Sequence, residues 1–140
     1  MFDVLEHIEQ DTETLVALRP LLAKGGRILI TIPACQWLYG IHDRFLHHKR
    51  RYSSRQLRSK LVDAGLRPVR LSHFNTILFP LAVVARLKDK LFRGATATGR
   101  RVPPSFINSL FRNVFGSERF LLRYFNLPFG VSLICVIETA

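Results

Sequence analysis

Apolar residues along the chain follow two different spacings, which predict alternating strands and helices. Residues 2–5 have the composition of a strand end. Asp11 and Thr12 are N-cap candidates for the helix that follows. The apolar face of this helix recurs at helical spacing and consists of Leu15, Leu18, Leu21 and Leu22. Gly25 and Gly26 are expected to end it.

The next elements continue this alternation. Residues 27–32 form an almost continuous apolar run, typical of a strand covered on both faces, and Pro33 ends it. Ser53 and Gln56 have the spacing of a capping box and predict a helix. Its inward residues are expected to be Leu57, Leu61 and Val62, and its end lies at Ala64-Gly65.

The last part of the chain predicts two strands separated by two helices. Residues 66–74 predict a strand with Val69 and Leu71 on one face. Apolar helices are predicted over 75–92 and 106–115, with a loop at 94–104, and residues 130–138 predict the final strand. The whole order predicts an α/β fold with a mostly parallel sheet.

Charge is distributed unevenly over this predicted fold. The chain has 140 residues, which fit one domain, and a formal net charge of +11. Residues 1–13 hold five carboxylates and no Lys or Arg, so the other residues together carry +16. This asymmetry indicates a local site in the first segment and an anionic partner or surface for the rest.

Several classes of protein do not fit the sequence. Two cysteines are too few for a disulfide framework or a metal cluster, which favours a reducing compartment. The most apolar run, 77–85, contains Pro80 and is far shorter than the roughly 20 residues of a membrane-spanning helix. The chain has no signal-peptide pattern and no signature of specific nucleic-acid binding. We therefore expect a cytoplasmic protein, with peripheral membrane contact as a further possibility.

Several motifs in chain order resemble those of one family. They are Asp3-Val-Leu-Glu-His7, Leu22-Ala-Lys-Gly-Gly26, Trp37-Leu-Tyr-Gly-Ile-His-Asp43 and His48-Lys-Arg-Arg-Tyr52. Together they resemble the C-terminal half of a class I S-adenosylmethionine-dependent methyltransferase of the broad type 11/12 kind. The resemblance covers essentially the whole chain. Lys24 stands where the family usually has proline.

The resemblance implies a partial Rossmann-like sheet. Residues 1–140 would form one partial domain with strands four to seven, the last strand antiparallel to the rest. Residues 74–127 would be a helical insertion before that strand, acting as a lid or a membrane-contact element. The glycine-rich cofactor loop of the family is not in this sequence. We therefore expect the acceptor-binding half of the enzyme, inactive alone, arising as a fragment, a mis-started reading frame or a remnant.

The first candidate residues lie at the end of the first predicted strand, where ligands bind in open α/β sheets. The resemblance places Asp3 and Leu5 beside S-adenosylmethionine, Glu6 beside the acceptor, and His7 among the catalytic groups. Some relatives, such as ubiquinone-pathway and small-RNA methyltransferases, hold a divalent ion with a similar motif. Asp3, Glu6 and His7 match that motif and would suit Mg or Mn, but no metal is assigned to this chain. In the alternative, these side chains only cap the next helix.

The long polar loop over 34–52 supplies the other candidates. We expect His42 to act as a general base oriented by Asp43, with His48 as a further catalytic group. Arg50 and Arg51 have the chemistry to clamp a phosphate or carboxylate of the acceptor, and Tyr52 is assigned to the same substrate site. The alternative is a solvated basic loop with one histidine packed against Trp37.

Two function classes remain open at this point. In the first, the chain binds a small-molecule or lipid-linked acceptor for methyl transfer. In the second, it is a non-enzymatic basic module that binds an anionic membrane surface, since basic residues accompany the apolar helices of residues 74–127.

Overall fold

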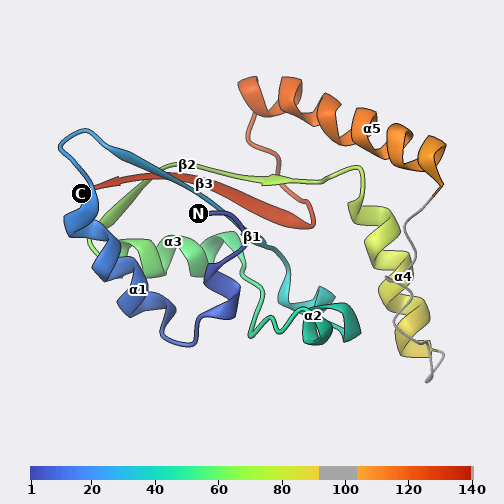
Figure 1. Cartoon of the computed structure of the whole chain (residues 1–140), viewed down its shortest axis with the longest axis horizontal. Coiled ribbons are helices and arrows are strands. Elements are labelled where there is room, and N and C mark those ends of the chain that lie inside the picture. The colour runs from blue at the N-terminus through green and yellow to red at the C-terminus, as the bar shows by residue number, and fades with distance from the viewer. Residues whose placement is uncertain (92–103, 140) are drawn as a thin grey trace.

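The computed structural model describes residues 1–91 and 104–139, apart from the side chains of 89–91, 106, 107 and 110. Within these residues the chain forms three strands, five α-helices and three short 3-10 helices (Figure 1). Their order is η1 (Leu5–His7), α1 (Asp11–Leu18), η2 (Arg19–Leu21), β1 (Arg27–Pro33), η3 (Gln36–Leu38), α2 (Ile41–Phe45), α3 (Ser54–Asp63), β2 (Leu66–Phe74), α4 (Phe79–Leu91), α5 (Ser105–Tyr124) and β3 (Ser132–Thr139). The fold is therefore mixed α/β, as predicted.

The sheet has the strand order β1-β3-β2, so the last strand lies between the other two. β3 is antiparallel to both neighbours, and β1 and β2 therefore run in the same direction. The prediction of an antiparallel last strand is confirmed. The prediction of a mostly parallel sheet is wrong for the described strands, because inserting β3 makes both of their pairings antiparallel. Phe2 adds one parallel bridge, to Thr31 at the outer edge of β1.

The core lies between one face of the sheet and two helices. Figure 1 shows α1 and α3 on this side of the sheet and α5 on the other. The sheet contributes alternate residues to the core, and the helices contribute leucines: Ile30, Ile32, Leu133, Cys135, Ile137, Leu15, Leu57 and Leu61. On the opposite face, Leu29 is 37% exposed and its neighbour Val136 is half-buried. One face of the sheet is thus covered more completely than the other.

The helix predicted after residue 53 forms as expected. Ser53 Oγ accepts a hydrogen bond from the Gln56 amide (3.2 Å), and the Ser53 amide donates to Gln56 Oε1 (2.9 Å). Gly65 ends the helical segment with φ +70°, a conformation that favours glycine. Leu57 and Leu61 are buried, but Val62 is 61% exposed. The inward position predicted for Val62 is wrong, because it lies one residue beyond Leu61 and faces solvent.

Two N-terminal predictions also need correction. Residues 2–5 do not form a regular strand: the chain makes the single bridge at Phe2, and Asp3 turns into the left-handed region with φ +48°. The first helix has Gln10 at its N-cap and gives way to a 3-10 turn at Arg19, well before the glycine pair. Pro20 lacks the amide hydrogen that a longer α-helix needs. Leu21 is consequently 78% exposed.

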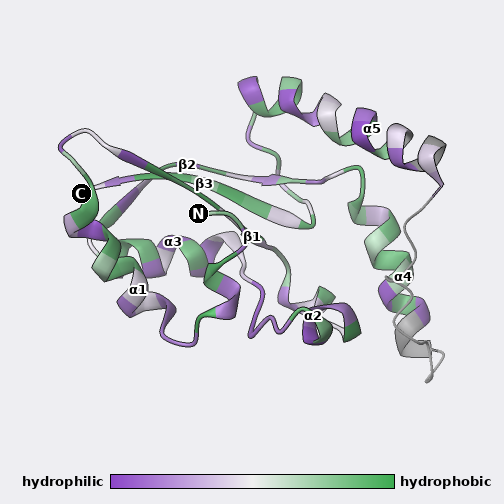
Figure 2. Cartoon of the chain, in the orientation of Figure 1, coloured by the Kyte–Doolittle hydropathy of each residue, from purple (hydrophilic) through white to green (hydrophobic). Residues whose placement is uncertain are grey.

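The two helices between β2 and β3 are present, with shifted ends. α4 begins at Phe79 and not at 75, and α5 continues to Tyr124, well past the predicted end at 115. Buried Glu118 joins α5 to the segment between β2 and α4, since its carboxylate accepts hydrogen bonds from the amides of Asn75 (2.6 Å) and Ile77 (2.9 Å). Most of the loop predicted at 94–104 lies outside the described residues. Figure 2 shows that polar and apolar residues alternate along α5.

None of the described helices combines the length and the apolar character needed to cross a membrane.

Candidate functional site

A buried carboxylate, Asp43 of α2, organises the loop between β1 and α3. Its side chain is fully buried, and Oδ1 accepts a hydrogen bond from Arg51 Nε (2.7 Å). Oδ2 accepts from the Gly40 amide (2.9 Å) and from Arg86 Nη2 of α4 (3.4 Å). Burial opposes ionisation of this carboxyl, but the hydrogen bond and charge of Arg51 outweigh it, so the pKa of Asp43 is lowered. Asp43 is therefore a stable anion that ties α2, α4 and the loop together.

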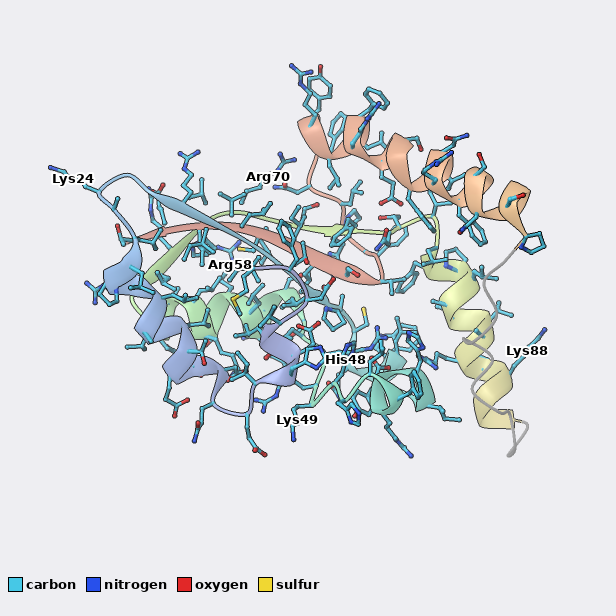
Figure 3. All side chains as sticks on the ribbon, viewed as in Figure 1. Lys24, His48, Lys49, Arg58, Arg70 and Lys88 are labelled. Carbon is cyan, nitrogen blue, oxygen red and sulfur yellow. The ribbon has the colours of Figure 1, made fainter. Side chains whose placement is uncertain are left out.

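Asp43 also fixes the orientation of one histidine. His48 Nδ1 lies 3.1 Å from Asp43 Oδ1, close enough for the ring nitrogen to donate to the carboxylate. Donation from Nδ1 leaves Nε2 with its lone pair. The sequence predicted this role for His42, but His42 is exposed on α2 and Asp43 turns toward His48. The oriented imidazole is therefore that of His48, which Figure 3 shows between η1 and α2.

Glu6 lies on the other side of the His48 ring. It is fully buried, and within the described residues neither of its carboxylate oxygens has a hydrogen-bond partner. Its Oε1 is 4.0 Å from His48 Nε2. The pKa of Glu6 is raised, chiefly by burial, with a smaller contribution from the charge of Asp3. An unpartnered buried carboxyl group is unfavourable for folding, which marks Glu6 as a candidate for function.

His7 completes a cluster with these two residues. Its ring meets that of His48 edge to face, with centroids 4.8 Å apart. One potential ligand atom from each of Glu6, His7 and His48 lies within 4.8 Å of the others. One carboxylate and two imidazoles are suitable ligands for a divalent metal ion, and the unpartnered carboxylate of Glu6 fits that use. Asp3 is not in this cluster, because its carboxylate accepts from Thr31 Oγ1 (3.2 Å).

Three residues assigned to substrate or cofactor lie inside the protein. Arg51 is 8% exposed. Its guanidinium donates to Asp43, and its Nη1 donates to the carbonyl of Ala34 (3.1 Å). Tyr52 is 2% exposed. The side chain of Leu5 belongs to the hydrophobic core. Arg51 and Tyr52 therefore support the loop from inside the protein, and their substrate roles and the cofactor role of Leu5 stay predictions.

A second buried carboxylate, Asp11, was missed as a site residue and treated only as a helix cap. Its Oδ2 accepts from Tyr52 Oη (2.7 Å) and Arg50 Nη1 (3.2 Å), and its Oδ1 accepts from Lys60 Nζ (2.7 Å). Burial and the neighbouring Asp11 raise the pKa of Tyr52. Arg50, expected to clamp the acceptor, instead joins α1 to the end of the loop. Acidic residues in the first turn of a helix are common, so the sequence held no signal for this network.

The loop over residues 34–52 packs against α4. Trp37 packs edge to face against Phe79 of α4, with ring centroids 5.9 Å apart, and not against a histidine. Arg86 of α4 donates from Nε to the carbonyl of Leu38 (2.7 Å) in addition to its contact with Asp43. α4 thus supports the candidate site on the side of Asp43.

Comparison with known proteins adds no identification. No family model matches this chain, and no curated protein matches it either.

Proposed function

We propose that this chain is the acceptor-binding half of an S-adenosylmethionine-dependent methyltransferase. The observation that carries the proposal is the cluster of Glu6, His7 and His48, with His48 oriented by Asp43. It follows directly on the Phe2 bridge to β1, at the end of the sheet where α/β proteins bind ligands.

The arrangement suits the chemistry of methyl transfer. The methyl group of a sulfonium is already activated, so the protein mainly positions the acceptor and accepts its proton. His48 Nε2 is the base in this proposal, because Asp43 holds the proton on Nδ1. Glu6 and His7 lie against the same His48 ring and would orient the acceptor. In an alternative arrangement, a divalent ion held by Glu6, His7 and His48 would occupy His48 Nε2, and it would polarise an acceptor oxygen in place of the free base.

Two further features support the proposal. The antiparallel position of β3 agrees with the sheet that the resemblance implies, with α4 and α5 as the insertion before the last strand. The chain also offers little of a cofactor site: Asp3 bonds to Thr31, and the side chain of Leu5 is in the core. We therefore propose that catalysis needs a glycine-rich element that this sequence does not contain.

Calorimetric titration with S-adenosylmethionine tests this function. A polypeptide extended at its amino end by the upstream coding sequence is expected to bind the cofactor more than about 100-fold tighter than residues 1–140 alone. The proposal fails if the upstream sequence encodes no glycine-rich strand-turn-helix, or if the extended polypeptide does not bind.

The outer face of α5 favours a second function, binding to an anionic membrane surface. Its only acidic residue, Glu118, is buried, whereas Arg112, Arg119 and Arg123 are exposed and share one side of the helix. Beside them, Phe120 and Tyr124 are 61% and 71% exposed. Arginines next to exposed aromatic rings are typical of helices that lie in the membrane interface.

Vesicle flotation tests this second function. Vesicles with about 30% phosphatidylglycerol are expected to bind the chain, and Arg112→Gln/Arg119→Gln/Arg123→Gln is expected to lower the affinity about 100-fold, near fivefold for each arginine. The charge-matched control is Lys24→Gln/Lys49→Gln/Lys88→Gln, whose lysines are exposed on other elements. Equal losses in both variants, or no flotation of the unaltered chain, would exclude α5 as the contact.

A further inference from the structure

A separate cavity, open to solvent, lies between the start of α3 and the edge strand β2, and the segment after α5 borders it. Its polar lining comes from Ser54, Arg55, Arg58, His73 and Asn126, and its apolar wall includes Leu71 and Leu127. The volume is about 390 Å³, within the range of roughly 300–1,000 Å³ that small-molecule sites occupy. No residue of the Glu6, His7 and His48 cluster contributes to it.

Hydrogen-bond donors dominate the polar lining of this cavity. His73 Nδ1 lies 3.2 Å from the carbonyl of Leu127 and donates to it, so Nε2 accepts from the Ser54 hydroxyl at 3.4 Å. Asn126 Oδ1 already accepts from Arg70 Nε (3.0 Å), so its amide nitrogen remains as a donor. The lining has no carboxylate of the kind that a cationic ligand would need.

The charge of the cavity is positive for two independent reasons. Arg55 and Arg58 are exposed at its rim, neither has an ion pair within the described residues, and no carboxylate lines the cavity. Ser54 and Arg55 are also the first residues of α3, a ten-residue helix whose amino end carries a partial positive charge. Guanidinium pairs beside a helix amino end are a frequent environment for oxyanions.

We propose that this cavity binds the phosphoryl group of a small molecule or a lipid headgroup. The two guanidinium groups and the Asn126 amide line the cavity from α3 and from the segment after α5, which suits the tetrahedral oxygens of a phosphate better than a planar carboxylate. Leu71 and Leu127 provide an apolar surface for the part of the ligand next to the phosphate. This site does not depend on the methyl-transfer function.

Titration with inorganic pyrophosphate tests the proposal. The unaltered chain is expected to bind it, and Arg55→Ala/Arg58→Ala is expected to weaken binding at least about tenfold, the usual effect of losing charge-assisted hydrogen bonds. Arg55→Lys/Arg58→Lys keeps the charge, loses the two-pronged geometry, and should lie between the two. Both arginines are exposed, so the variants keep the fold, which circular dichroism checks.

The control removes two positive charges elsewhere. Figure 3 shows Lys24 and Lys88 near opposite ends of the molecule, away from Arg58. Lys24→Ala/Lys88→Ala is expected to change the affinity less than about twofold. An equal loss in this control would overturn the proposal, because binding would then follow net charge alone. Absence of pyrophosphate binding by the unaltered chain at about 10 mM would also overturn it.

Two further probes distinguish the source of the phosphate. Binding of glycerol 3-phosphate in solution, weakened by Arg55→Ala/Arg58→Ala, assigns the cavity to a soluble ligand. Binding to phosphatidic acid vesicles that is weakened by the same variant, and not by the α5 variant, assigns it to a headgroup. If the arginine variant weakens neither, the proposal is wrong.

Discussion

Asp43→Ala is expected to lower the free energy of unfolding by about 3–5 kcal/mol, the range for breaking one side of a buried charge network. The carboxylate is fully buried and receives hydrogen bonds from Arg51, Arg86 and the Gly40 amide. Among the described residues, removing it leaves the buried Arg51 guanidinium with the Ala34 carbonyl as its remaining hydrogen-bond acceptor, and it also releases the ring of His48. Urea unfolding at pH 7 measures the loss.

Asp63→Ala is the matched control for this experiment. Asp63 ends α3, is exposed, and makes one long hydrogen bond with Ser59 (3.4 Å), so its removal should cost less than about 0.5 kcal/mol. Similar losses for the two variants would show that Asp43 does not hold the loop together.

The same network predicts how the effect depends on pH. The pKa of Asp43 is lowered in the folded protein, since Arg51 outweighs the opposing effect of burial. The stabilisation is therefore complete above the ordinary aspartate pKa of about 3.9, and it is lost as the pH falls through the lowered folded value. The difference between the unaltered chain and Asp43→Ala should shrink in acid.

Glu6→Gln is expected to act in the opposite direction and raise the free energy of unfolding by about 1–2 kcal/mol at pH 7. Burial without a hydrogen-bond partner in the described residues raises the pKa of Glu6. A raised pKa means that the folded state disfavours the charged form. The penalty begins above the ordinary glutamate pKa of about 4.3 and is complete above the folded value. The gain in the free energy of unfolding from Glu6→Gln should therefore disappear in acid.

Glu9→Gln controls for the change in net charge, because Glu9 is exposed on the same segment. It should alter stability by less than about 0.5 kcal/mol. If Glu6→Gln destabilises the chain instead, the carboxylate has a supporting structural role and is not a candidate functional group. A gain in stability would show that the chain keeps a charged group at a cost, as binding sites do.

Local signals in the sequence predicted much of the fold. The hydroxyl and amide of Ser53 and Gln56 defined the start of α3, and Gly65 defined its end, because capping depends on neighbouring residues only. The bounds of β1 followed from an almost continuous apolar run, and those of β2 followed from a segment with alternating apolar residues. The position of β3 between β1 and β2 did not follow from such signals, because pairing between distant strands leaves no periodicity in the sequence of either strand. The bulge between Pro68 and Arg70 similarly left Val69 exposed.

The candidate site was predicted in outline and wrong in its pairings. Glu6, His7 and His48 were named and lie together, since a strand end and the next loop meet at one edge of the sheet. Neighbours in sequence suggested the pair His42 and Asp43, but one turn of helix points adjacent side chains in different directions. The support from Arg86 comes from a helix 43 positions further along the chain. No residue near Asp43 in the sequence indicates this contact with Arg86.

The attachment of α5 to β2 has a mechanical consequence. Arg70 donates to the carbonyls of Leu122 and Phe125 and to Asn126, and the amide of Leu127 donates to Ser72 Oγ (2.8 Å). These bonds hold the end of the helix, and the Asn126 and Leu127 part of the cavity wall that follows it, against β2. A shift of α5 would therefore move that wall, so binding of a ligand in the cavity would be thermodynamically linked to the position of the helix in both directions.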